Sequence, residues 1–428
     1  MSNSFSKEER VAFEDILEGF NDALVLSRNV SIYNTDSSMM ERTNNVIYRP
    51  QPYISQSYDG MDQTGNFTAY TQLSVPATLG FQKSVPFILD ALELRDALQE
   101  GRLGEAAKQK LASDINLAIM NVAATQGSLV VTTSTAAGDY DDIALCDSVM
   151  NEQGVQSFDR YLALSSRDYN GLAGNIAGGA GGASVSRSFA GNKSNNAFER
   201  SYVGMVAGFE TYKLDYANRL TGATGADPTM STLAAANNFY VPQATQTAVT
   251  GETQNVDNRF QTITVSSTTD LPVGTAIEIQ GVEAVHHITK QGTGFSKTFR
   301  VVSVTNGTTC VITPPIISAQ GGTDAELQYQ NCIVTAAAGR TINRLNTTTA
   351  PVNCFWQKDA LEILPGRYSV PSDAGVAVMR ASTDQGIELV MQKQYDVNTM
   401  KTKYRLDTLF GVVNKQPEMS GILLFNQA

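Results

Sequence analysis

The sequence predicts an α+β fold in which a small antiparallel β-barrel is inserted into a larger body. Three observations predict it. Residues 255–317 alternate apolar and polar side chains between turn signals, residues 103–125 carry the spacing of one long helix, and strand-like segments follow residue 375. Short strands separated by frequent turns favour a closed barrel, because closure removes the exposed strand edges that pair with other chains.

The alternation within 255–317 is clearest at three pairs of apolar residues separated by one polar residue. These are Ile263 and Val265, Ile277 and Ile279, and Val302 and Val304. Turn chemistry separates the runs at 271–274, at 291–294 and at Asn306-Gly307.

Length and composition limit the classes of protein. A chain of 428 residues can bury more than one core. With 42% hydrophobic residues and a mean hydropathy of −0.17, it contains no run near the roughly 20 apolar residues that a membrane helix needs. The N-terminus lacks the features of a signal peptide, so we expect residence in a cytoplasm. The widely spaced Cys146, Cys310, Cys332 and Cys354 are expected to be buried free thiols.

The charge balance argues against tight DNA binding. The chain carries 31 basic and 42 acidic residues, a net charge of −11, and the basic residues are scattered. Proteins that grip duplex DNA through its phosphates need clustered Lys and Arg. If this protein lies close to nucleic acid, we expect it to do so without tight or specific binding.

Residues 7–28 predict an amphipathic helix. Its apolar stripe consists of Phe13, Ile16, Leu17, Phe20 and Leu24. Its acidic residues are Glu8, Glu9, Glu14, Asp15, Glu18 and Asp22. Two interpretations stay open: a helix docked on its own body with a solvated acidic face, or an arm that docks on neighbouring subunits and offers carboxylates to a basic partner. Residues 31–45 are polar, as in a connecting arm.

The next segments predict a hairpin and two helices. Residues 46–85 read as a long, projecting two-stranded hairpin that cannot fill a core and should pack on something else. Pro86 is expected to open a helix that ends near Gly101. The helix over 103–125 would reach roughly 33 Å at 1.5 Å per residue. Gly127 ends it, and a strand is expected at 129–132.

An α+β region and a set of C-terminal strands flank the barrel. We expect a helix at 144–154, a strand at 160–165, a helix from Arg167, and a Gly-rich surface loop at 171–196. That loop lacks the GK[ST] sequence of a phosphate-binding P-loop, and no predicted strand leads directly into it. The C-terminal strands are expected at 375–381, 387–395, 403–413 and 422–425, in one layer with the long helix.

No constellation of catalytic residues is present. His286 and His287 are the only histidines, and adjacent strand residues point to opposite faces, so both cannot easily serve one site. The acidic cluster Asp139, Asp141 and Asp142 precedes a helix and is typical of turn and N-cap chemistry. We therefore expect no enzyme, no cofactor and no metal site.

The order of parts resembles the major capsid (coat) proteins of tailed phages, which have the Hong Kong 97 fold, and in particular those of short-tailed lambdoid phages with an insertion domain. Nearly the whole chain takes part in the resemblance. The similar segments are 92–96, 118–130, 255–260, 272–274, 281–282 and 355–360.

This resemblance implies the following domains: an N-terminal arm (1–45), an E-loop (46–85), P-domain spine helices (86–130), an A-domain (131–222), an inserted β-barrel (223–345), an A-domain return (346–383) and P-domain strands (384–428). It implies hexamers and pentamers in an icosahedral procapsid built around a scaffolding protein, with a portal protein at one vertex and expansion as double-stranded DNA is packaged. It implies no membrane partner.

Two hypotheses about residues follow from the resemblance. Glu8, Glu9, Glu14 and Asp15 are expected to pair with a basic scaffolding helix. The loop at 238–254 is expected to contact the neighbouring capsomer, with Thr250, Glu252, Asp257 and Arg259 as its polar contact residues. The alternative is a tail-associated or secreted binding module whose barrel reads carbohydrate, with Tyr240 as its candidate aromatic. A soluble enzyme is the remaining class.

Overall fold

The computed structural model describes most of the chain, and the chain divides into two compact units. The described residues are 5, 7–33, 46–52, 54–55, 57–90, 97–138, 140–176, 196–197, 199–223, 225, 227–230, 242–247, 253–335, 339–368 and 376–427. The first unit comprises Met1–Tyr48, Pro76–Ile119 and Glu362–Val413, and the second comprises Arg49–Val75, Met120–Leu361 and Asn414–Ala428.

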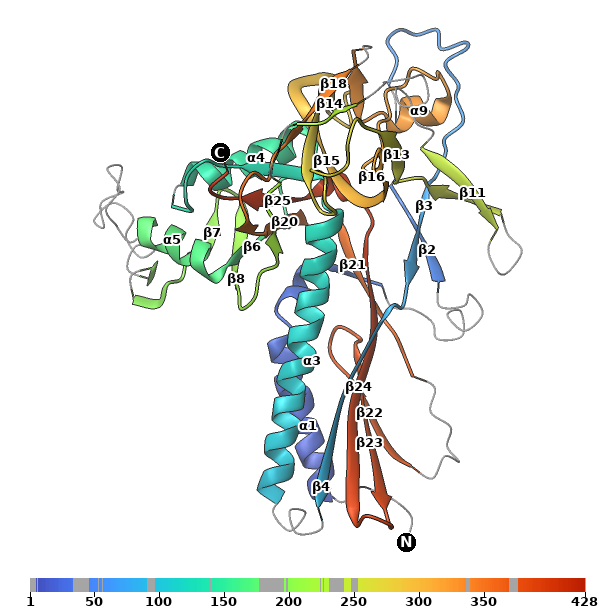
Figure 1. Cartoon of the computed structure of the whole chain (residues 1–428). Coiled ribbons are helices and arrows are strands. Elements are labelled where there is room, and N and C mark those ends of the chain that lie inside the picture. Colours follow the sequence, from blue (N-terminus) through green and yellow to red (C-terminus); the bar gives the residue numbers. More distant parts are fainter. Residues whose placement is uncertain are drawn as a thin grey trace. The chain divides into compact units, whose positions relative to one another are not determined.

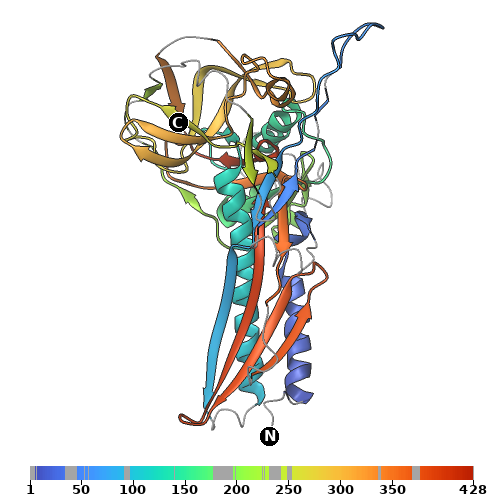
Figure 2. The ribbon, with the colours of Figure 1, turned by 90° about the vertical axis from the view of Figure 1, so that its right-hand side faces the viewer.

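The first unit packs helices beside a long sheet (Figures 1 and 2). Its helices are α1 (Lys7–Ala23), the short 3₁₀ helix η1 (Leu26–Asn29) and the part of α3 (Ala97–Gln126) up to Ile119. Its strands, in order across the sheet, are β1 (Ser31–Ile32), β21 (Leu361–Pro365), β24 (Lys401–Asn414), β23 (Glu388–Asp396) and β22 (Ala377–Ser382), and β4 (Phe81–Asp90) also pairs with β24. The predicted long helix at 103–125 is confirmed as part of α3.

The predicted helix from Pro86 is wrong, because β4 passes through Pro86 as a strand. This strand pairs antiparallel with β24 from Lys401↔Asp90 to Phe410↔Phe81. Two cross-strand aromatic pairs fix the register: Phe81 stacks on Phe410 at 5.3 Å and Phe87 on Tyr404 at 5.2 Å between ring centroids. Such directly opposed pairs stabilise a sheet. Residues 91–96 of the predicted helix lie outside the described residues.

Helix α1 docks on α3 through the apolar stripe that the sequence predicts. Phe13, Ile16 and Phe20 are buried. A Cβ at Gly104 of α3 would lie 2.4 Å from Cδ1 of Ile16, so the Ile16 side chain would have to shift to make room for it. Asn116 of α3 also donates from Nδ2 to the carbonyl of Ala23 at 3.3 Å. The interpretation of a helix docked on its own body is therefore confirmed for this face of α1.

The second unit contains a mixed six-stranded sheet flanked by two helices. In order, its strands are β5 (Leu129–Thr132), β25 (Ser420–Leu424), β20 (Asn353–Gln357), β6 (Arg160–Ser165), β8 (Phe209–Leu214) and β7 (Met205–Val206). The helices are α4 (Tyr140–Glu152) and α5 (Ser166–Ile176). The predicted strands at 129–132 and 160–165 are confirmed, as are the two helices. Most of the Gly-rich loop, residues 177–195, lies outside the described residues.

Strand β25 corrects the prediction that all C-terminal strands share one layer with the long helix. It pairs parallel with β5 and antiparallel with β20 in the mixed sheet, whereas β22, β23 and β24 lie in the first unit. All five residues of β25 are buried. A strand buried on both faces is typical of a central position in a sheet, and its partners are set by contacts far along the chain.

The inserted barrel is confirmed as a seven-stranded antiparallel sheet that nearly closes on itself. In order, its strands are β10 (Thr229–Met230), β18 (Arg340–Arg344), β14 (Ala276–Val285), β15 (Gly292–Asn306), β16 (Thr309–Thr313) and β13 (Gln261–Thr264), and β17 (Cys332–Val334) also pairs with β14. A bridge between Met230 and Val265 joins the two ends, and Ser266 N donates to Thr229 O at 2.7 Å.

The barrel core differs from the predicted alternation in one strand. Ile263, Val265, Ile277 and Ile279 belong to the core cluster, as expected, but Val302 and Val304 do not. The pairing of β15 with β16 shifts its register between Val301 and Ser303. A bulge of this kind changes which side chains face inward, so Phe299 and Val301 fill the core while Val304 is 38% exposed.

Smaller elements complete the described part of the chain. A four-stranded sheet has the order β11 (Gln243–Thr247), β12 (Thr253–Asp257), β3 (Ser74–Thr78) and β2 (Val46–Pro50), so the two strands predicted within 46–85 are neighbours. The others are β9 (Arg219–Leu220) with β19 (Ala350–Pro351), the helix α9 (Asp324–Tyr329) and the 3₁₀ helix η3 (Pro417–Met419). No helix among the described residues is long and apolar enough to cross a membrane.

The four cysteines are buried free thiols, as predicted. Burial raises the pKa of the Cys310 thiol to about 11 and the pKa values of Cys332 and Cys354 to about 12. Burial also raises the pKa of Cys146. A thiol with a raised pKa stays protonated and unreactive at neutral pH, so these side chains act as small apolar groups.

We predict that Ile16→Ala destabilises the subunit by about 2–5 kcal/mol, because it leaves a cavity beneath α1. The matched control is Val11→Ala on the exposed face of the same helix, which should change stability by less than about 0.5 kcal/mol. Urea unfolding of the purified subunit, followed by circular dichroism, measures both. Equal effects of the two substitutions would contradict the docking of α1.

Candidate functional site

The predicted acidic residues of α1 fall into two groups. Glu14 and Asp15 are exposed, and Glu8 lies in the first turn of the helix. Glu9 is buried, forms an ion pair with Lys393, and accepts a hydrogen bond from the Tyr404 hydroxyl at 3.1 Å. The prediction that Glu9 is offered to a partner is therefore wrong.

The spacing of the helix explains the burial of Glu9. Residues three and four apart lie on one face of a helix, and Glu9 precedes Phe13 by four positions and Ile16 by seven. The carboxylate therefore belongs to the apolar stripe, where it needs a cation from the sheet. This position in the stripe is the sequence signal for the burial of Glu9.

The four residues predicted to contact a neighbouring capsomer also fall into two groups. Thr250 and Glu252 lie outside the described residues. Asp257 ends β12, and Arg259 donates to its Oδ2 from Nε at 3.1 Å and from Nη2 at 2.9 Å. The two side chains are only 12% and 10% exposed. Their use as surface contacts to a neighbouring capsomer is a wrong prediction, because both are held inside the subunit.

Arg259 has further partners in the chain segment that precedes β25. Its Nη1 donates to the carbonyl of Asn414 at 2.6 Å, and its Nη2 lies 3.1 Å from the carbonyl of Lys415. Gln51 donates from Nε2 to Asp257 Oδ2 at 2.9 Å and to the Lys415 carbonyl at 3.0 Å. Burial raises the pKa of Asp257, although Arg259 and Gln51 act in the opposite direction. We call Gln51, Asp257 and Arg259 the arginine cluster.

A second buried cluster contains His287, Lys297 and Glu418, which we call the glutamate cluster. His287 Nε2 lies 2.9 Å from Glu418 Oε2, and Lys297 Nζ pairs with the other carboxylate oxygen. Burial disfavours the ionised carboxylate, but His287 and Lys297 beside it outweigh burial and lower the pKa of Glu418. Glu418 therefore stays ionised inside the protein.

Sequence reasoning expected that His286 and His287 could not easily serve one site, and it did not single out Lys297 or Glu418. One signal was available for the lysine. Lys297, Phe299 and Val301 stand two residues apart in β15, and all three are buried. A lysine in line with inward-facing residues needs an acidic partner. Its identity could not be read from the sequence, because Glu418 lies 121 residues away.

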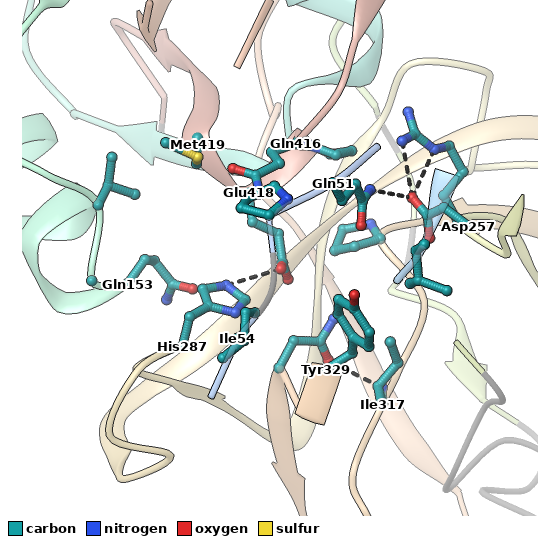
Figure 3. A pocket seen from close by; sticks show the side chains of 18 of the residues that line it. Gln51, Ile54, Gln153, Asp257, His287, Ile317, Tyr329, Gln416, Glu418 and Met419 are labelled. Atoms are coloured by element: carbon teal, nitrogen blue, oxygen red, sulfur yellow. Dashed lines mark hydrogen bonds and ion pairs between the residues drawn. The ribbon is translucent and has the colours of Figure 1, made fainter. Parts of the chain in front are cut away.

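A cavity of about 430 Å³ lies between the two clusters (Figure 3). Figure 3 shows Glu418 and His287 on one side and Gln51 and Asp257 on the other, with the Tyr329 ring near the middle. The carboxylates of Asp257 and Glu418 already have cationic partners. The third carboxylate of the lining, Asp359, is exposed to water. Within the described residues, no group of three His, Cys, Asp or Glu side chains could hold a metal ion.

Two of the three acidic residues predicted to precede a helix lie in the first turn of α4, which begins at Tyr140. These are Asp141 and Asp142. Carboxylates there are stabilised by the N-terminal backbone amides and the helix dipole. Asp139 lies outside the described residues.

The segment between β2 and β3 exposes large apolar side chains. Met61 is 104% exposed, Phe67 is 89% exposed and Tyr70 is also exposed. The base of the segment packs inward, because Leu73 clusters with Ile317 and Tyr329. Large apolar side chains that stay in water in the single subunit can mark an interaction site. The tip of this segment is therefore a candidate assembly surface.

Comparison with known proteins identifies the family. The family model described as P22 coat protein, gene protein 5, matches residues 1–426. Among solved structures, the chain is similar to one from Mycobacterium phage Che8 at 11% identity, covering 94% of this chain and 90% of that chain with a TM-score of 0.44. It is similar to the capsid of cyanophage P-SCSP1u at 10% identity, covering 93% and 86% with a TM-score of 0.45.

The barrel region has a relative of its own. The CUS-3 coat protein I-domain is 35% identical, and the match covers 29% of this chain and 98% of that domain with a TM-score of 0.23. The family model, by contrast, spans nearly the whole chain. The chain therefore belongs to the P22 coat protein family: it is a non-enzymatic major capsid protein of a tailed phage, located in the virion shell, with a Hong Kong 97-like α+β fold and an inserted antiparallel barrel.

Proposed function

We propose that copies of this chain assemble into the hexamers and pentamers of an icosahedral procapsid around a scaffolding protein. The shell then expands as double-stranded DNA is packaged through a portal protein at one vertex. Membership of a coat protein family supports this proposal. The structural observation that carries it is the exposed apolar tip between β2 and β3, with Met61 and Phe67. A neighbouring copy that covers this tip would remove these side chains from water.

The charge and the expected strength of contacts agree with this role. A net charge of −11 suits the wall of a container in which DNA must slide and repack. Shell assembly also needs individually modest contacts, because each additional 1.4 kcal/mol slows release about tenfold and traps errors. Many simultaneous contacts then stabilise the closed particle.

The domain boundaries implied by the resemblance remain part of this proposal. The arm, E-loop, spine, A-domain, barrel and P-domain strands are units of assembly in it. Membership of a coat protein family favours this proposal over a carbohydrate-reading module. Tyr240, the aromatic residue named for that alternative, lies outside the described residues.

We predict that Met61→Ser with Phe67→Ser slows shell formation at least tenfold. Burying one such side chain contributes about 1.5–3 kcal/mol, which the polar replacement removes from each contact. Light scattering and negative-stain electron microscopy of purified subunits with scaffolding protein measure the rate and the product. The control is Val273→Ser, an exposed apolar residue of the barrel. Wild-type assembly by the double variant would contradict the role of this tip, and subunits that never form particles with any helper would contradict the proposed function.

We predict that Glu14→Ala with Asp15→Ala reduces the uptake of scaffolding protein and makes the remainder less sensitive to salt. Exposed ion pairs contribute only about 0.2–1 kcal/mol each and are screened by salt, which suits a partner that must leave. Glu105→Ala on α3, another exposed carboxylate, is the control. Sedimentation of procapsids assembled at several salt concentrations measures uptake. Unchanged, salt-dependent uptake by the double variant would rule out this pairing.

We predict that deleting residues 248–252, between β11 and β12, yields tubes or aberrant shells from folded subunits. In the proposal this loop, with Thr250 and Glu252, touches the neighbouring capsomer. Circular dichroism checks the fold of the subunit, and electron microscopy shows the particles. Normal shells from the deleted chain would refute the inter-capsomer role of the loop.

A further inference from the structure

The segment that leads into β25 is held on both sides of the cavity. We call residues 414–419 the terminal connector. Its backbone is tied by Lys415 N, which donates to the Ala360 carbonyl at 2.8 Å, and by Ser128, whose N and Oγ each lie 3.0 Å from the Pro417 carbonyl. At the start of the connector, Arg259 donates to the carbonyls of Asn414 and Lys415. Near its end, Glu418 pairs with His287 and Lys297. The connector is therefore a fixed point within the second unit.

The arginine cluster lies at the base of the β11–β12 hairpin. Asp257 pairs with Gln243 as the first rung of that hairpin, and Asn258 N donates to the Pro242 carbonyl at 2.9 Å just below it. On its other side, β12 makes a single parallel pairing with β3, Val256↔Ser74. Among the described residues, this pairing is the only strand pairing between the hairpin and β3. The Asp257–Arg259 pair at the hairpin base is thus well placed to set the direction of the hairpin.

The geometry of Arg259 suits it to this task. Its guanidinium donates to one carboxylate oxygen on the hairpin side and to two consecutive carbonyls on the connector side. A planar fork with several fixed donors can hold both sides at once, whereas a lysine ammonium on a flexible stem cannot reproduce this geometry. The site is largely withdrawn from water, with Arg259 9% exposed, so salt screens it little.

We propose that Arg259 is a positioning residue for the β11–β12 hairpin. By fastening Asp257 at the hairpin base to the carbonyls of residues 414 and 415, it sets the direction of β11 and β12. The consequence for shell geometry rests on the proposed inter-capsomer role of residues 248–252. The attachment of the hairpin to the connector is a property of the single subunit and can be measured separately.

The first test is hydrogen exchange of the unassembled subunit, measured by mass spectrometry. Arg259→Lys keeps the charge and loses the fork, so exchange in 253–257 and in the terminal connector should rise at least tenfold, while β13 to β16 stay protected. The matched control is Arg344→Lys. Arg344 is a barrel residue that also pairs with an aspartate, Asp227, and with a carbonyl, that of Gly225, away from the hairpin. Wild-type exchange in the hairpin of Arg259→Lys would overturn the proposal.

A second variant separates positioning from general stability. Arg259→Met with Asp257→Asn removes both buried charges together, so the barrel should fold. The Asn414 carbonyl then loses its donor, and the Lys415 carbonyl keeps only Gln51. We expect its hairpin to exchange as fast as that of Arg259→Lys with an unfolding midpoint close to wild type. Slow exchange in this double variant would show that other contacts hold the hairpin, and the proposal would be wrong.

Electron microscopy of assembled particles completes the test. If the proposal holds, Arg259→Lys gives the same class of aberrant shells as deletion of residues 248–252. Normal shells from Arg259→Lys with aberrant shells from the deletion would overturn the effect of positioning on assembly. Normal shells from the deletion itself would refute the inter-capsomer role, and the exchange data would still decide whether Arg259 holds the hairpin.

Discussion

The barrel and the mixed sheet of the second unit are joined by charges that lie out of water. Glu418 comes from the connector before β25, and its partners Lys297 and His287 come from the barrel. A buried ion costs several kcal/mol unless a partner is in place, and breaking such a pair by removing one side costs about 3–5 kcal/mol. Each cluster is therefore stable only when the connector and the barrel are both in position. This requirement makes the placement of the barrel within the unit specific.

Local sequence patterns predicted most helices and strands. The predictions failed where pairing with a strand far along the chain determines the structure of a segment. The strands at 129–132 and 160–165 are short apolar runs next to clear turn or cap signals. The segment 81–90 was misread because Pro86 and a following apolar group resemble a helix start. The alternation of its side chains is explained by its pairing with β24, where Phe81 stacks on Phe410 and Phe87 on Tyr404. For β25 the sequence shows a buried strand, but only the fold shows that β5 and β20 are its neighbours.

The candidate sites show the same division between local and distant information. Exposure of Glu14 and Asp15 follows from helix periodicity alone, and the same rule, applied to Glu9, would have placed it with Phe13 and Ile16. The arginine cluster could not be derived in this way. Asp257 and Arg259 are two residues apart, but what makes them internal is the approach of the backbone of residues 414 and 415. That approach depends on the path of the chain through the whole unit.

The same chemical groups thus serve two purposes that differ in their exposure to water. Buried pairs such as Lys297 with Glu418 are hardly screened by salt and hold one subunit in one shape. Exposed carboxylates such as Glu14 and Asp15 have full access to water, so their contacts are weak and reversible. A shell protein needs both kinds, because errors are corrected only if contacts between copies break more easily than the copies themselves deform. The count of 42 acidic residues therefore overstates the acidic surface open to partners, since Glu9, Asp257 and Glu418 are already paired with cations inside the subunit. The net charge of −11 is unaffected, because each pair removes one charge of either sign.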